Sequence, residues 1–163
     1  MPVVAGHGAW CHCRRHQRTE CVALPLIIDL KPGEKLIING AVLENASSNT
    51  KVRVLNDCSI LRQKEILSDS DSVTPASRVY FALQCAYIFP TKRGEYLRMF
   101  NHYLDSYVEA CPSASAIKDE INEAVAEGHY YKALKATRHL LDHETKVLGS
   151  LQSVAAADAV VQD

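Results

Sequence analysis

Basic side chains recur through residues 24–67 at positions where they could bind the phosphate groups of a nucleic acid. They are Lys31, Lys35, Lys51, Arg53, Arg62 and Lys64. Phosphate contacts made by Lys and Arg supply much of the affinity of proteins for nucleic acids. Residues 24–67 contain no Phe, Tyr or Trp, so bases cannot stack on this segment as they do on the sheet of an RNA-recognition motif. Base recognition would therefore fall to strand edges and to the planes of arginine side chains.

Arg62 is the first choice among these candidates, because it places a planar, bidentate donor at a predicted strand end. The alternating Lys51 and Arg53 fit a simpler interpretation as well, the solvated face of a half-buried sheet. Residues 1–67 carry nine Lys or Arg against six Asp or Glu, whereas residues 68–163 carry nine against thirteen. A basic half beside an acidic half is typical of a nucleic-acid surface joined to a protein-binding one.

A second group of potentially reactive residues lies near the N-terminus: Cys11, His12, Cys13, His16 and Cys21. Thiols and imidazoles are the usual ligands of zinc, but the spacing C-x-C-x₇-C lacks the paired C-x₂₋₄-C units of structural zinc sites. We therefore predict neither a metal site nor a cofactor. The sequence also lacks a nucleophile elbow, a Gly-rich phosphate loop and a His-Glu-x₂-His motif, so we predict that the protein is not an enzyme.

Short strands must position the basic residues. Runs of β-branched and apolar residues predict strands over 26–30, 35–38, 41–44, 51–55 and 59–62. The dipeptide Asn39-Gly40 predicts a two-residue type I′ hairpin, because both central positions of that turn need a positive φ. The polar cluster 45–49 predicts a second, longer hairpin loop. Strict alternation predicts that Val52 and Val54 face the core of the sheet.

The remainder of the chain is predicted to be helical. Thr74-Pro75 is typical of a helix start, with Thr as the N-cap and Pro at the first helical position. Apolar residues at three- and four-residue steps predict helices over 75–88, 95–110, 115–127 and 130–148. Gly128 is expected to be an αL cap between the last two. The predicted fold class is α+β, a small N-terminal antiparallel β unit followed by a C-terminal bundle of about four α-helices.

These elements divide the chain into five predicted segments: a disordered leader (1–23), a β domain (24–67), a linker (68–74), a helical bundle (75–148) and a flexible tail (149–163). The bundle is the candidate protein-binding part, through Tyr80, Phe81, Phe100 and Tyr131. The β domain is small enough to require dimerisation or docking on the helices. No stretch approaches the ~20 apolar residues of a transmembrane helix, and no signal-peptide core is present. A cytoplasmic protein with reduced cysteines is therefore expected.

Six longer motifs occur in a specific order along the chain. They are Asp29–Val42, Ile60–Leu67, Thr74–Ala76, Arg78–Gln84, Asp119–Asn122 and Glu127–Lys135. With these motifs the chain resembles the FlbT family of flagellum-biosynthesis regulators of alphaproteobacteria, over about residues 24–145. The resemblance implies a post-transcriptional repressor that binds the 5′ untranslated region of flagellin mRNA and promotes its degradation or blocks its translation. Members usually begin near the first strand, so residues 1–23 are additional to the resemblance.

The β segment is also similar to CsrA, a small dimeric β protein that clamps mRNA leaders. In that family basic residues of the first and last strands form the RNA edge, and Lys31 and Arg62 fall at or within one residue of those places. Leu30 stands where a second basic residue would be expected. This likeness implies an RNA-binding strand edge and a homodimer. The alternative function is a protein-interaction adaptor or chaperone-like regulator of flagellin secretion and assembly, with flagellin or FlaF as the partner implied by the family.

Overall fold

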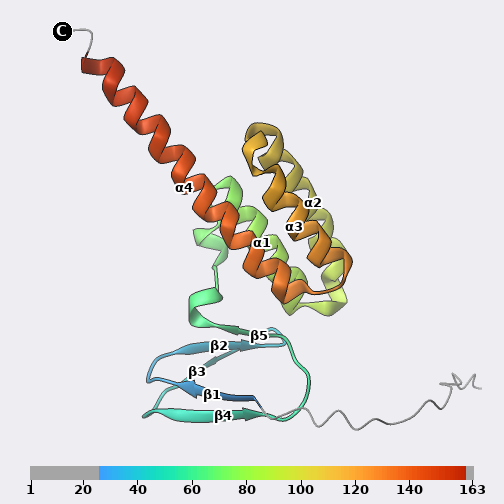
Figure 1. Ribbon diagram of the computed structural model, residues 1–163. Coiled ribbons are helices and arrows are strands. Elements are labelled where there is room, and N and C mark those ends of the chain that lie inside the picture. Colours follow the sequence, from blue (N-terminus) through green and yellow to red (C-terminus); the bar gives the residue numbers. More distant parts are fainter. Residues whose placement is uncertain (1–25, 161–163) are drawn as a thin grey trace, which may run out of the picture.

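A computed structural model describes residues 26–160 of the chain, with side chains over residues 26–151. Five strands form an N-terminal β unit: β1 (Leu26–Leu30), β2 (Lys35–Ile38), β3 (Ala41–Glu44), β4 (Thr50–Val54) and β5 (Ile60–Arg62). Four helices follow: α1 (Pro75–Ile88), α2 (Arg93–Ala110), α3 (Ser115–Ala126) and α4 (Tyr130–Val160). Short 3-10 turns connect them: η1 (Gln63–Glu65), η2 (Asp69–Asp71), η3 (Pro90–Lys92) and η4 (Pro112–Ala114). Figure 1 shows the β unit below the helical bundle, and the predicted α+β class is confirmed.

The strands of the β unit are antiparallel and form two small sheets. One sheet contains β1 and β4, and the other has the order β3-β2-β5. The turn between β2 and β3 is the predicted type I′ hairpin: Asn39 and Gly40 have φ values of 49° and 87°, and Ile38 lies opposite Ala41. The sequence therefore fixes this register through local turn chemistry.

The second predicted hairpin, through residues 45–49, is wrong. The segment instead carries the chain from one sheet to the other, since β3 pairs with β2 and β4 pairs with β1. The buried side chain of Asn45 stabilises this crossing: its Nδ2 donates to the carbonyl oxygens of Leu30, at 3.0 Å, and of Ser48, at 2.8 Å. A polar cluster is expected in either kind of loop, so composition could not separate a hairpin from a crossing.

The two faces of β2 contribute to two different cores. Leu36 lies with Ile28 and Leu30 in a small core inside the β unit, which Val52 and Val54 cover as predicted. On the opposite face, Ile37 of β2 and Leu61 of β5 belong to the main helical core. The β3-β2-β5 sheet is therefore docked on the helices, one of the two routes to stability expected for so small a unit.

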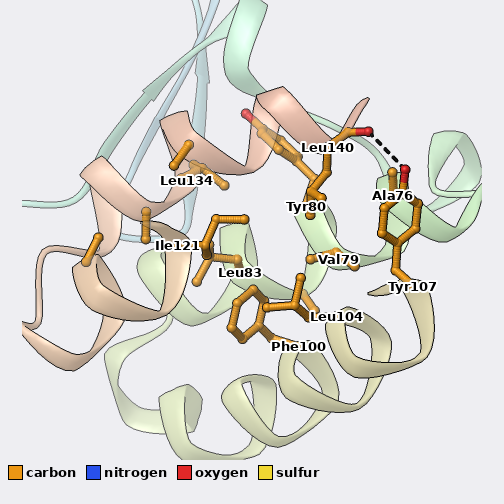
Figure 2. Packing of buried hydrophobic residues seen from close by; sticks show 14 of the residues in the cluster. Ala76, Val79, Tyr80, Leu83, Phe100, Leu104, Tyr107, Ile121, Leu134 and Leu140 are labelled. Carbon is orange, nitrogen blue, oxygen red and sulfur yellow. Dashed lines mark hydrogen bonds between the residues drawn. The ribbon is translucent and has the colours of Figure 1, made fainter. Parts of the chain in front are cut away.

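The helical core forms where α1 packs against α2 and α4, and where α3 packs against α4. Figure 2 shows its largest side chains converging from all four helices: Val79, Leu83, Phe100, Leu104, Ile121, Leu134 and Leu140. Helix α1 begins as predicted, with Pro75 at its first position and the Thr74 side chain accepting from the Ser77 backbone N–H at 3.2 Å. Gly128 has a φ of 77°, which confirms the predicted αL cap before α4.

Helix α4 is longer than predicted. It was expected to end near Leu148, but it continues to Val160, and Figure 1 shows this part extending beyond the other helices. Gly149 costs only about 1 kcal/mol in a helix, and the run of alanines at 155–157 has the highest helix propensity of any residue. No helix among residues 26–160 is both long and apolar enough to cross a membrane.

Candidate nucleic-acid interface

A polar cleft of about 630 Å³ opens where the β unit meets helix α4. Its cations are Lys31, Arg62, Lys64 and Arg138, and its carboxylates are Glu34 and Glu65. We call this hollow the seam cleft. Three of the six cations predicted to bind RNA lie in it, although they come from two strand ends and from the turn η1. The fourth cation, Arg138, belongs to the helical bundle.

Hydrogen bonds join η1, which lines the seam cleft, to helices α1 and α4. The Tyr80 hydroxyl donates to the backbone oxygen of Glu65 at 2.8 Å, and the Tyr131 hydroxyl donates to its carboxylate at 2.7 Å. Nη2 of Arg138 donates to the backbone oxygen of Lys64 at 2.6 Å. These bonds hold the basic end of β5 against α1 and α4. Burial, and the bond to Glu65, raise the pKa of Tyr131 to about 12, so its hydroxyl stays a neutral donor near pH 7.

Arg62 lies at the centre of the seam cleft, where its backbone ends β5. Its Nη2 donates to the backbone oxygen of Asp29 at 3.0 Å and to Oε1 of Glu34 at 2.8 Å. The other guanidinium nitrogens form no hydrogen bond with residues 26–151, and the side chain is 49% exposed. The guanidinium is therefore fixed in position by one nitrogen and still presents donors to an anion.

Glu34 limits the positive charge of the cleft. Its carboxylate accepts from the backbone N–H of Lys31 at 3.0 Å and from Arg62. The backbone hydrogen bond and then the Arg62 hydrogen bond hold the pKa of Glu34 below its usual value of 4.5, so it is charged near neutral pH. Four cations against two carboxylates leave the cleft net positive.

The other three predicted RNA-binding residues lie outside the seam cleft. Lys51 pairs with Asp29 at 3.5 Å, and the two share a shallow hollow of about 310 Å³ with Lys31 beside the cleft. Lys35 pairs with Glu44 at 3.7 Å on the β2–β3 hairpin. Arg53 is exposed on β4, opposite Ile27. Lys51 thus lies in a hollow that shares Lys31 with the seam cleft, whereas Lys35 and Arg53 line neither hollow.

Two of the four predicted protein-binding residues are in the wrong place for that role. Phe100 is fully buried, and Tyr80 is 4% exposed with its hydroxyl bonded inside the seam, so neither presents a surface to a partner. Both side chains belong to the helical core, which explains their position on the apolar faces of α1 and α2. Phe81 is half-buried and lines a groove of about 240 Å³ between α1 and α2, which we call the helical groove. Tyr131 faces the seam.

Arg138 is the cation of the seam cleft that was not among the residues predicted to bind RNA. It lies 74 residues beyond Lys64, whose carbonyl it contacts. A signal was present, because Tyr131, Lys135 and Arg138 recur at helical spacing and so share one face of α4. Only the docking of β5 on that face makes them part of the site.

The N-terminal cysteine and histidine group lies outside the described residues. Within residues 26–151 no three His, Cys, Asp or Glu side chains come close enough to hold a metal ion. The described cysteines are Cys58, Cys85 and Cys111, all as free thiols. Burial raises the pKa of the Cys85 thiol to about 11, so this thiol is protonated at neutral pH.

Comparison with known proteins places this architecture in one family. The family model described as "Flagellar protein FlbT" matches residues 26–148, which include both the β unit and most of the bundle. The chain belongs to the FlbT family. The match begins at the first residue of β1 and takes in every residue of the seam cleft.

Named FlbT proteins cover most of the chain. "Flagellum biosynthesis repressor protein FlbT" of Caulobacter vibrioides is 31% identical over 136 residues, 82% of this chain and 96% of that protein. The probable repressor FlbT 1 of Bradyrhizobium diazoefficiens is 33% identical over 131 residues, 80% of this chain and 89% of its own length. The probable repressor of Mesorhizobium japonicum is 33% identical over 135 residues, 81% and 90% of the two chains. No solved structure matches the chain.

Proposed function

We propose that this FlbT-family protein represses flagellum biosynthesis in the cytoplasm by binding the 5′ untranslated region of flagellin mRNA in the seam cleft. Binding there promotes degradation of the message or blocks its translation. The names of its relatives support the repressor role. The contact with RNA rests on the cleft itself and on the family resemblance.

The observation that carries the proposal is the convergence of four cations on one cleft from separate parts of the chain. Lys31 directly follows β1, Arg62 ends β5, Lys64 lies in η1 and Arg138 in α4. A polyanion can contact all four, since the cleft is open and its Arg62 guanidinium keeps free donors. Each phosphate that displaces counterions adds to affinity and makes it salt-dependent.

The carboxylates of the cleft are consistent with this function. Glu34 and Glu65 are each engaged by groups of the protein, through Arg62 and Tyr131 respectively. Glu34 therefore positions the Arg62 guanidinium, and Glu65 helps to hold η1 against α4. Their charge also weakens binding to any polyanion, which favours selection of a particular RNA over tight binding to all RNA.

The proposal is tested with the double variant Arg62→Ala, Lys64→Ala and the parent, using a labelled flagellin leader RNA at fixed ionic strength. We expect at least a severalfold loss of affinity with an unchanged circular dichroism spectrum. The matched control is Arg98→Ala, Lys146→Ala, which removes the same charge from exposed positions of α2 and α4. Equal loss in both double variants, or parental affinity in the first, contradicts a site in the seam cleft.

A second candidate function, the protein-interaction adaptor, is favoured by the helical groove. Phe81, Tyr96, Met99 and Tyr103 line it, and Met99 is 40% exposed. Aromatic and methionine side chains on a surface groove suit an apolar partner segment. Flagellin or FlaF are the partners proposed for this groove.

A homodimer is proposed through the β unit, where Val42 of the edge strand β3 is 63% exposed.

A further inference from the structure

A second hollow, of about 460 Å³, lies where Ser59, just before β5, meets the start of α4. We call it the tyrosine pocket. The residues of its lining that matter here are Tyr87, Arg93, His129, Tyr130, Tyr131 and Lys132.

Aromatic rings and cations are already stacked in the tyrosine pocket. The guanidinium carbon of Arg93 lies 4.4 Å from the centre of the Tyr130 ring, and Nε of Arg93 donates to the backbone oxygen of Ala86 at 3.1 Å. The Tyr87 and Tyr131 rings lie 5.8 Å apart. These contacts hold the Arg93–Tyr130 pair as a flat platform before any ligand binds, with the Tyr87 and Tyr131 rings beside it.

One face of α4 joins the tyrosine pocket to the seam cleft. Tyr131 lines the pocket and bonds to Glu65, which lines the cleft. Lys135 follows, with its Nζ 4.5 Å from the centre of the Tyr131 ring, and then Arg138 in the cleft. The seven residue-to-residue steps from Tyr131 to Arg138 rise about 10 Å along the helix axis. That distance matches about three nucleotides at a stacked rise of about 3.4 Å.

We propose that the tyrosine pocket holds an unpaired nucleobase of the RNA strand whose phosphates occupy the seam cleft. This inference rests on the proposed function and deepens it, since it makes the ligand single-stranded RNA. Unpaired bases stack on aromatic rings and on arginine planes, and that is how proteins recognise RNA loops and single strands. Phosphates beside the base would meet Lys132 and Lys135.

The tyrosine pocket would supply the aromatic rings that the β unit lacks. The β unit contains no aromatic residue, which excludes stacking on the sheet itself. The bundle supplies the rings instead, at the edge of the same seam. Glu127 moderates the charge there: its carboxylate forms an ion pair with Lys132 at 3.8 Å and a hydrogen bond with Nδ1 of His129 at 3.0 Å. A mixture of rings and partly neutralised cations suits a base and one or two phosphates, whereas an apolar peptide would bury these cations.

The test compares the parent with Tyr130→Leu on a twelve-residue oligouridylate with one central 2-aminopurine, and on a fully paired RNA duplex. Losing one base–aromatic stack is expected to weaken single-strand binding roughly fivefold to 150-fold, and to relieve the quenching of 2-aminopurine. Duplex binding should be unchanged, because a duplex offers no unpaired base. Tyr130→Phe, which keeps the ring, should restore both readouts. Tyr103→Leu in the helical groove is the matched control.

The possible failures are distinguishable. If the parent binds the oligonucleotide while Tyr130→Leu keeps parental affinity and quenching, the pocket assignment is wrong and the proposed function stands. If the parent binds neither the oligouridylate nor a flagellin leader RNA, the pocket assignment and the proposed function both fail. If Tyr130→Leu does not fold, the rim variant His129→Ala, Lys132→Gln replaces it. That variant should lose affinity for the single strand severalfold, and parental binding by it would overturn the inference.

Discussion

The seam cleft and the helical groove, for which we propose different partners, differ in the residues that line them. Cations and carboxylates from strand ends, η1 and α4 line the cleft. Apolar and aromatic side chains from α1 and α2 line most of the groove. Binding in the cleft should therefore be electrostatic and sensitive to salt, whereas binding in the groove should depend on buried apolar area.

The two hollows also depend on different parts of the fold. The cleft exists only because the β unit is docked on the bundle, since its residues come from both. Most of the groove is internal to the bundle, apart from Asp69 and Ser72 in and beside η2. A change that loosens the docking should therefore affect the cleft and leave the groove, and the reverse holds for a change inside α2.

The largest effect is expected from Leu61→Ala. Leu61 is fully buried and brings β5 into the helical core. Its truncation should lower the free energy of unfolding by about 2–5 kcal/mol, through lost burial and the cavity left behind. RNA binding should fall with it, because the seam cleft loses its docked strand. Urea denaturation gives the stability and fluorescence polarisation gives the affinity.

The matched control for Leu61→Ala is Leu43→Ala on the edge strand β3. Leu43 is 44% exposed, so its truncation should change stability by about 0.5 kcal/mol or less. A Leu61→Ala protein as stable as this control would contradict a role for the Leu61 side chain in docking β5 on the helices.

A smaller effect is expected in the salt dependence of RNA binding. Lys64→Gln removes one cation from the cleft and should reduce the slope of log K against log salt by about 0.7 for a single strand. Phe81→Ala in the helical groove should leave the slope and the RNA affinity at parental values. Titrations from about 50 to 200 mM salt measure both. A parental slope in Lys64→Gln means that Lys64 contacts no phosphate.

Local features of the fold were predictable from the sequence because short-range chemistry determines them. The Asn39-Gly40 turn, the Thr74 cap and the αL residue Gly128 each depend on a few neighbouring residues, and all three have the predicted conformation. Sheet pairing was not predictable in the same way. Residues 45–49 cross between sheets because Val52 and Val54 find their apolar partners on β1, which is a long-range preference.

The candidate site shows the same limit. Lys31, Arg62 and Lys64 were predicted from their basic side chains near strand ends, and these three share the seam cleft. Arg138 and the tyrosine pocket were missed, since they join the site only through packing between distant segments. Phe100 was misassigned for a related reason: an aromatic residue on an amphipathic helix has the same spacing whether it is buried or contacts a partner.

The smallest predicted effect comes from Glu34, whose carboxylate lies in the cleft. Hydrogen bonds from Lys31 and Arg62 lower its pKa in the folded state. A lowered pKa contributes stability above the unfolded pKa, and this contribution is lost as the pH falls through the folded pKa. Glu34→Gln cannot ionise, so the decline in its stability below about pH 4.5 should be shallower than in the parent. Urea midpoints at several acidic pH values measure it.

At neutral pH the same substitution should act on function in the opposite direction. Removing the Glu34 charge leaves the cleft more positive and loosens Arg62, so affinity for RNA should rise slightly while the preference among RNA sequences falls. Glu109→Gln, at an exposed position of α2, is the control and should behave as the parent in both assays. Because the helical groove contains neither Arg62 nor Glu34, partner binding there should be unchanged. A loss of RNA affinity in Glu34→Gln would mean that the carboxylate positions Arg62 more than it opposes the phosphate.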